Sequence, residues 1–250
     1  MTLRLGVVSD VHMRSEYREE VTAELTGVVD RWKEFDPDLV VVLGDLIEDE
    51  TPELDREHVE RVREILSFGP PLRILAGNHD VMNLSLETLR SLFGNPLGGV
   101  TRMRGETLVF LNSAAPRLGN PRGEIADEHI RLLERLDPAE PITIFVHHPL
   151  HYRDLSETVW WPTRPEEAFC GNKTAVNEVL EDLSVRCVIN GHLHDPAHTR
   201  YRGVNHVTIN AFSKEMPEKP VTGTYAEIEI GETVRVETTV GSETVSEYEF

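Results

Sequence analysis

The sequence is poor in cysteine and in long apolar segments, which argues against a disulfide-rich protein and against a membrane-spanning one. Its two cysteines, Cys170 and Cys187, form neither a CxxC pair nor a disulfide framework, so we interpret both as reduced thiols. No apolar run approaches the roughly 20 residues that a membrane helix needs. The segment "MTLRLGVVSD" also lacks the features of a signal peptide. We therefore expect a globular protein of the cytoplasm with no membrane partner.

Basic residues are also scarce, and lysine most of all. The sequence has 44 Asp and Glu residues against 25 Lys and Arg residues, which gives a formal net charge of −19, and only four of the basic residues are lysines. An acidic surface of this kind suits concentrated salt, where charge repulsion is screened, so we expect a halophilic source. A merely acidic protein is the open alternative. The negative field disfavours nucleic acid as a partner because phosphates are repelled.

Apolar runs alternate with segments of helical periodicity through the first part of the chain. The apolar runs at 3–10, 38–45 and 72–80 are predicted strands, and the segments 17–35 and 55–68 are predicted helices. This alternation predicts parallel strands with helices packed on them.

The rest of the chain mixes both kinds of element. Further strands are predicted at 98–113 (a hairpin turning at Gly105), 141–149 and 185–195, further helices at 84–93, 124–136 and 173–183, and hairpins at 199–210 and 223–240. The segment 151–170 has no clear period, so we predict a long functional loop there. Because no linker or repeat interrupts the chain, we predict a single domain over residues 1–250.

Five of the predicted strands end in side chains that can bind metal ions or move protons. These ends are Asp10-Val11-His12, Gly44-Asp45, Gly77-Asn78-His79-Asp80, His147-His148-Pro149 and Gly191-His192-Leu193-His194. In open α/β sheets, ligands bind in the crevice at the carboxyl ends of the strands. We therefore expect these groups to converge on one site. Capping and turn formation can explain any one of these ends, but not all five together.

The donors at these strand ends are carboxylates, imidazoles and an amide. Calcium prefers oxygen donors alone, so this mixture favours first-row metals. The donors outnumber the four that a tetrahedral zinc site accepts. Two metal ions bridged by one carboxylate accommodate them, and a pair about 3.5–4 Å apart can clamp the attacking and leaving oxygens of a phosphoryl transfer.

The ordered series D-x-H, G-D, G-N-H-D, H-x-P and G-H-x-H resembles the calcineurin-like metallophosphoesterase superfamily, and it spans residues 10–194. The resemblance implies an α/β fold, a four-layer α-β-β-α sandwich with two mixed β-sheets. It also implies a ligand set. Asp10, His12 and His194 would hold a first metal ion, Asp45 would bridge, and Asn78, His147 and His192 would hold a second.

The resemblance further assigns the residues that meet the substrate. Asn78 and His79 would contact the phosphate, His79 would help to protonate the leaving group, and Asp80 would orient His79. His147 is favoured over its neighbour as the metal ligand. This leaves His148 for the substrate or for a supporting position.

The remaining histidines and a tryptophan pair are given ordinary positions. His58 and His129 are predicted to be solvated on helices, His198 and His206 to lie on strand surfaces, and His151 to have a plain loop role. Trp160 and Trp161 are predicted to pack the loop onto the sandwich or onto an oligomer partner, with stacking on a substrate ring as the alternative.

The function implied is hydrolysis of a phosphodiester, either a cyclic nucleotide or a glycerophosphodiester-like compound. The enzyme would use two divalent or mixed-valence ions of manganese, iron or zinc and act on a small phosphorylated substrate. A phosphomonoesterase is one alternative, and a metal-binding scaffold that lacks the catalytic histidine is another. The presence of His79 and of every ligand position argues against the scaffold. A DNA-repair nuclease is disfavoured because the sequence has no basic stripe, and a homo-oligomer stays open.

Overall fold

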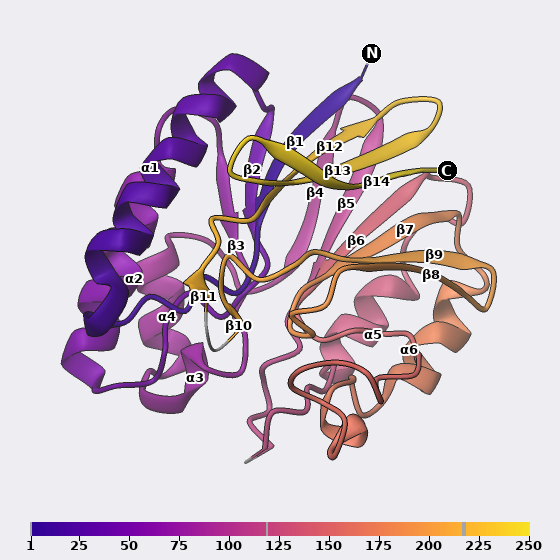
Figure 1. Ribbon diagram of the computed structural model, residues 1–250. Coiled ribbons are helices and arrows are strands. Elements are labelled where there is room, and N and C mark those ends of the chain that lie inside the picture. The colour runs from indigo at the N-terminus through magenta and orange to yellow at the C-terminus, as the bar shows by residue number, and fades with distance from the viewer. Residues whose placement is uncertain (1, 119, 217–218) are drawn as a thin grey trace.

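The structure is a computed structural model that describes residues 2–118, 120–216 and 219–250. Two six-stranded sheets face each other, and helices cover the outer side of each sheet (Figure 1). Each sheet mixes parallel and antiparallel strand pairs. The expected four-layer α-β-β-α sandwich is therefore confirmed.

The first sheet is formed by the beginning and the end of the chain. Its strands are β1 (Leu3–Val8), β2 (Leu39–Val42), β3 (Leu72–Ile74), β12 (Tyr225–Ile230), β13 (Val234–Val240) and β14 (Glu243–Glu249). Their order is β14-β13-β12-β1-β2-β3, with β1 to β3 parallel and the last three strands antiparallel. Helices α1 (Arg18–Phe35), α2 (Pro52–Leu66) and α4 (Leu86–Phe93) cover its outer face (Figure 1).

The second sheet is formed by the middle of the chain. Its strands are β4 (Gly99–Met103), β5 (Glu106–Leu111), β6 (Ile142–Val146), β7 (Val185–Asn190), β8 (Ala197–Tyr201) and β9 (Val204–Thr208). Their order is β4-β5-β6-β7-β9-β8, and β5, β6, β7 and β9 are parallel. Helices α5 (Asp127–Leu133) and α6 (Lys173–Leu180) cover its outer face (Figure 1).

Alternate residues of the strands divide between separate apolar layers. On β1, Leu5 and Val7 pack between the two sheets, whereas Val8 packs with the helices. On β5, Phe110 lies between the sheets and Val109 faces outward. Side chains of a strand alternate between its faces, so strands that are apolar throughout can be buried on both sides. This is why apolar residues occur on both faces of these strands.

Several short elements depart from the sequence prediction. Helix α2 begins earlier than predicted, at Pro52, because Thr51 accepts a hydrogen bond from the Leu54 amide and caps the helix. Helix α5 is shorter than the predicted 124–136. The structure also contains α3 (Asp80–Asn83), the 3₁₀ helices η1 (Ser15–Tyr17) and η2 (Pro165–Glu167), the hairpin strands β10 (Ser213–Met216) and β11 (Lys219–Val221), and strand β14. No helix among the described residues is long and apolar enough to cross a membrane.

Candidate metal centre

The side chains that follow β1 and β7 form the first half of a buried cluster. The Nε2 atoms of His12 and His194 lie 3.2 Å apart, and His194 Nε2 lies 3.2 Å from Asp10 Oδ1. Asp10 is fully buried, and His12 is 3% exposed. The donor atoms of these three residues all lie within 4.8 Å of one another. A single cation can therefore contact all three.

The side chains that follow β2, β3 and β6 form the second half. His147 Nε2 lies 3.3 Å from Asp45 Oδ2 and 3.3 Å from Asn78 Oδ1. The other ring nitrogen, Nδ1, lies 3.0 Å from the Leu43 carbonyl oxygen, to which it donates. In neutral His147 this tautomer leaves Nε2 without a proton, so three acceptor atoms then face one another. A cation among them removes the repulsion.

Asp45 and His192 connect the two halves. Asp45 Oδ2 lies 3.3 Å from His147 Nε2 and 3.9 Å from His12 Nε2, so it faces both groups. The His192 ring is centred 5.0 Å from that of His147. Its Nε2 atom is buried and has no hydrogen-bond partner among the described residues. Such an atom is costly to bury unless it binds a ligand, and imidazole nitrogen is a common metal donor. The residues therefore fit two metal ions.

The charges of the cluster also favour cations. Burial alone would raise the pKa of Asp10, but the adjacent His194 outweighs it and lowers that pKa to about 2. Burial is likewise outweighed at Asp45, where His147 and His79 lower the pKa well below its ordinary value. Burial opposes charge on His147, yet Asp45 raises the pKa of that imidazole to about 9. The two carboxylates are thus ionised, and in the absence of metal a proton on His147 offsets part of their charge.

The backbone at these residues is held in an unusual conformation. Asp10, His12, Asp45, His192 and His194 all have positive φ, between 44° and 69°. They are five of the eight non-glycine residues with positive φ in the described chain. This left-handed conformation costs about 1–3 kcal/mol where the residue does not favour it, and it concentrates at functional sites. The convergence of side chains therefore depends on a left-handed backbone at the strand ends, which Asp and His adopt more readily than most residues.

Two glycines allow the backbone to approach these carboxylates. A Cβ atom on Gly77 would lie 2.1 Å from Asp45 Oδ1, and one on Gly191 would lie 2.5 Å from Asp10 Oδ2. No larger residue fits either position without moving a carboxylate of the cluster. Steric exclusion of a Cβ atom thus explains why glycine precedes Asn78 and His192 in the two motifs.

The role expected of Asp80 was wrong. Its carboxylate accepts hydrogen bonds from three backbone amides, those of Asp45 (2.9 Å), Leu46 (2.9 Å) and Gly77 (2.8 Å). Burial and the nearby Asp45 carboxylate raise the pKa of Asp80, to about 7. Asp80 therefore ties the loop after β2 to the loop after β3, and it does not orient His79.

Two acidic residues that the sequence reasoning missed hold the histidines. Asp49 Oδ1 lies 2.5 Å from His79 Nδ1, and Glu48 Oε2 lies 3.1 Å from His12 Nδ1. The hydrogen bond with His79 lowers the pKa of Asp49. Both acids belong to the run Glu48-Asp49-Glu50 after the Gly-Asp motif, and in so acidic a sequence a short acidic run gives no distinct signal.

His148 lies in a supporting position, which was one of the two roles expected of it, and it also borders a pocket beside Asn78. Its Nδ1 lies 2.8 Å from Ser113 Oγ, and its Nε2 lies 2.8 Å from the Pro121 carbonyl oxygen, to which it donates. Burial and the neighbouring His147 lower the pKa of this imidazole to about 3. Both nitrogens are thus used within the protein. The His148 ring packs 4.4 Å from that of His192 and supports it.

The other histidines divide into buried and exposed groups. The prediction of solvated positions was wrong for His58 and His206, which are 1% and 0% exposed, and it holds for His198. His129 is half-buried, and its Nδ1 accepts a hydrogen bond from the Asn112 amide. His151 is buried in the loop and packs against His206, with ring centroids 5.0 Å apart.

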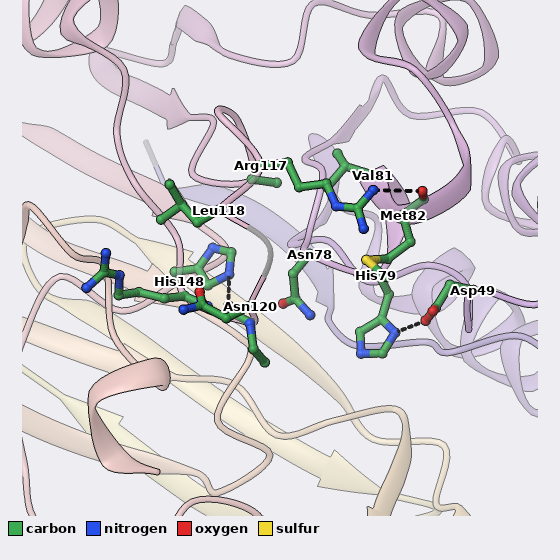
Figure 2. Close-up of a pocket in the computed structure, with 12 residues that line it drawn as sticks. Asp49, Asn78, His79, Val81, Met82, Arg117, Leu118, Asn120 and His148 are labelled. Atoms are coloured by element: carbon green, nitrogen blue, oxygen red, sulfur yellow. Dashed lines mark hydrogen bonds and ion pairs between the residues drawn. The ribbon is translucent and has the colours of Figure 1, made fainter.

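Two pockets open onto the metal centre and share Asn78, His79 and Pro121. The first, which we call the arginine lobe, has a volume of about 200 Å³ and is also lined by Arg117, Arg122, Val81, Met82 and Leu118. The second, which we call the aromatic lobe, has a volume of about 310 Å³ and is also lined by Trp160, Trp161, Arg164, His192 and His194. Figure 2 shows the arginine lobe, with Asn78 between His148 on one side and His79 with Asp49 on the other.

The tryptophan pair forms one wall of the aromatic lobe. Trp161 is buried, its Nε1 donates to the Leu193 carbonyl (3.1 Å), and its ring lies 4.7 Å from that of His192. Trp160 is half-buried, with its ring centred 6.0 Å from that of His194. The prediction that this pair packs the loop onto the sandwich is confirmed for Trp161. Trp160 presents part of its ring to the pocket.

Comparison with known proteins agrees with this geometry. The model of a family described as "Calcineurin-like phosphoesterase" matches residues 3–196. A probable cyclic nucleotide phosphodiesterase of Synechococcus is 28% identical over 207 residues, which are 78% of this chain and 74% of the relative. A probable cyclic nucleotide phosphodiesterase of Psychrobacter is 25% identical over 67% of this chain and 49% of its own length.

Solved structures share the fold at low sequence identity. A dimetal phosphatase of Danio rerio has a TM-score of 0.79 at 17% identity and covers 99% of this chain and 98% of its own. A protein of Thermus thermophilus has a TM-score of 0.60 at 12% identity, covering 96% and 99%. At these identities, the likeness concerns the fold alone.

Proposed function

The chain belongs to the calcineurin-like phosphoesterase family, whose members are metal-dependent hydrolases, and we propose that it hydrolyses a phosphodiester with a nucleoside substituent. The observation that carries this proposal is the meeting of two pockets at Asn78 and His79. A phosphate held there has room for one substituent on each side, which a diester requires and a monoester does not. The relatives named as probable cyclic nucleotide phosphodiesterases support the nucleoside.

We propose the metal ligands that the family resemblance implies, and the distances between their side chains support this assignment. Asp10, His12 and His194 would hold one ion, Asn78, His147 and His192 the other, and Asp45 both. Their mixture of carboxylate, imidazole and amide donors suits manganese, iron or zinc. When bound, two such ions lower the pKa of the attacking water and neutralise charge on the phosphate oxygens.

His79 would act on the leaving group. Its Nδ1 donates to Asp49, which fixes the ring, so Nε2 is the atom that would give a proton. A bond would form between phosphorus and the oxygen of water, which releases a proton to solvent, while the bond to the leaving oxygen breaks and His79 protonates that oxygen. Such assistance is worth about 10²–10⁴-fold. Asp49 would be a positioning residue that acts through His79.

Trp160 would bind the base of the nucleoside. Aromatic side chains stack on bases without regard to sequence, with about 1–3 kcal/mol per base. The ring of Trp160 lines the aromatic lobe beside His194, close to where the phosphate would lie. Trp161 would instead keep His192 in place, because it is buried against that ring.

The test compares matched substrates with the manganese-reconstituted protein. Thymidine 5′-(p-nitrophenyl) phosphate and methyl p-nitrophenyl phosphate are diesters with the same leaving group, and p-nitrophenyl phosphate is the monoester. We expect kcat/KM to be at least about tenfold higher for the thymidine diester than for the monoester, and the Trp160→Leu variant to raise KM by about tenfold for the thymidine diester alone. The exposed Val159→Leu change is the matched control.

Two results would contradict the proposal. A monoester that is hydrolysed as fast as either diester would favour the phosphomonoesterase alternative. If the Trp160→Leu change raises KM equally for the methyl and thymidine diesters, the nucleoside does not bind in the aromatic lobe.

A further inference from the structure

The arginine lobe joins a cationic end to an apolar wall. Arg117 and Arg122 line it together with Val81, Met82 and Leu118. Arg117 donates one N–H to the Met82 carbonyl oxygen at 3.1 Å, as Figure 2 shows. A guanidinium has five N–H donors in a fixed fork, so most of those of Arg117 are left for a ligand.

The charge of this lobe is opposite to that of the chain. The formal net charge of the protein is −19, yet the only acid that lines the lobe among the described residues is Asp49, and Asp49 is paired with His79. Neither Arg117 nor Arg122 forms an ion pair with a carboxylate of the described chain. In the aromatic lobe, by contrast, Arg164 is already paired with Glu167 at 3.2 Å. The arginine lobe is therefore the part of the site with unbalanced positive charge.

The position of this lobe relates it to the leaving group. His79 lies on its wall together with its partner Asp49. His79 also lines the aromatic lobe, where the base of the nucleoside is placed beside Trp160, so the arginine lobe is left for the group attached to the leaving oxygen.

We propose that the arginine lobe is a subsite for a leaving group that carries a second anion, either a carboxylate or a phosphate-type group, on an apolar or ring-shaped body. This inference rests on the proposed phosphodiesterase function. Arginine pairs with planar and tetrahedral oxyanions through two parallel hydrogen bonds. The preferred substrate is then a linear diester with an anionic substituent. In a 3′,5′-cyclic nucleotide both ester oxygens belong to one sugar, and the lobe would receive no anion.

The test uses diesters that differ only in the charge of the leaving group. Methyl phosphodiesters of 4-hydroxybenzoate, 4-hydroxybenzamide and 4-hydroxyphenylphosphonate are incubated with the manganese-reconstituted protein, and released phenol is measured by chromatography. The carboxylate and phosphonate arms distinguish the two kinds of anion. The variants are Arg117→Gln, Arg122→Gln and the double change, with the exposed Arg135→Gln, which lines neither lobe, as the matched control.

We expect the ratio of kcat/KM for the anionic to the neutral diester to fall by about tenfold in each single variant, relative to wild type and to Arg135→Gln. A ratio that is equal in all proteins would overturn the subsite while leaving phosphodiester hydrolysis in place. If no diester is hydrolysed by wild type, the proposed function fails instead.

Binding of the product phenols tests the proposed anion subsite without relying on turnover. Calorimetry with 4-hydroxybenzoate and 4-hydroxybenzamide should show tighter binding of the anion to wild type, by about tenfold or more, and no difference in the double variant. Equal affinity of wild type for both compounds would overturn the proposal.

Discussion

The two buried histidines outside the metal centre, His151 and His206, should make the protein sensitive to mild acid. Both are almost fully buried, their rings are centred 5.0 Å apart, and none of their four ring nitrogens has a hydrogen-bond partner among the described residues. Burial, the neighbouring His206 and Arg153 lower the pKa of His151 to about 3. Burial and His198 lower that of His206 to about 4.

The sign of the effect follows from where the protons bind. An unfolded histidine titrates near 6.5, so between about pH 6.5 and pH 4 the unfolded chain binds up to two protons that the folded protein excludes. The free energy of unfolding therefore falls with falling pH, by about 1.4 kcal/mol per pH unit for each histidine and about 2.7 kcal/mol for the pair. Over two pH units this approaches 5 kcal/mol, which is comparable to the whole stability of a marginal domain.

The assay is urea unfolding at pH 7.5, 6.5, 5.5 and 4.5 at constant ionic strength, on metal-free protein. We expect the free energy of unfolding to fall less steeply with falling pH in the double variant His151→Phe/His206→Phe than in wild type. The difference in slope should be about 2.7 kcal/mol per pH unit below pH 6.5. Phenylalanine keeps a ring of similar size where no hydrogen bond is lost. His198→Gln, at an exposed position, is the control and should keep the wild-type slope. Equal slopes for wild type and the double variant would refute the reasoning.

Three further predictions concern the site and the surface. His79→Ala should keep its metal ions, while its kcat should fall by about 10²–10⁴-fold for an alkyl leaving group and much less for nitrophenolate. Asp49→Asn should show the same pattern with smaller losses. Equal losses for both leaving groups would mean that His79 is not the general acid. Gly77→Ala should lower the free energy of unfolding by about 1–3 kcal/mol and weaken metal binding, because the added Cβ atom meets Asp45. Gly27→Ala is the control: its Cβ atom would meet nothing within 4 Å, and alanine in helix α1 should stabilise the protein by about 1 kcal/mol. Urea titrations measure the stability of both variants, and metal analysis measures their binding. The melting temperature should rise from low to molar potassium chloride, and a flat or falling curve would contradict the inference from the acidic composition.

The parallel strands and the ligands at their ends were readable from the sequence because both signals are local. Leu39–Val42 is apolar at every position, as a strand buried on both faces must be, and Asp45 follows it directly. Residues that terminate parallel strands reach one edge of a sheet whatever the lengths of the helices between them. The family motifs then gave the order in which these ends occur.

The contacts around the ligands were not readable, because they join segments that are distant in sequence. Asp49 follows β2 by seven residues and meets His79 thirty residues later, whereas Asp80, the adjacent acid, turns inward to bind backbone amides. His206 looked like a surface residue in an alternating strand, but the loop that carries His151 covers it. Strand β14 was missed because its residues are mostly polar and exposed and resemble a tail.

The number of metal ions bound per chain tests the central claim most directly. Wild-type protein, Asp45→Ala and His79→Ala would be reconstituted with manganese, freed of excess metal by gel filtration and measured by elemental analysis. We expect two ions for wild type and for His79→Ala, and one or none for Asp45→Ala, because Asp45 faces both groups of ligands. One ion or none in wild type, or two ions retained by Asp45→Ala, would contradict this expectation.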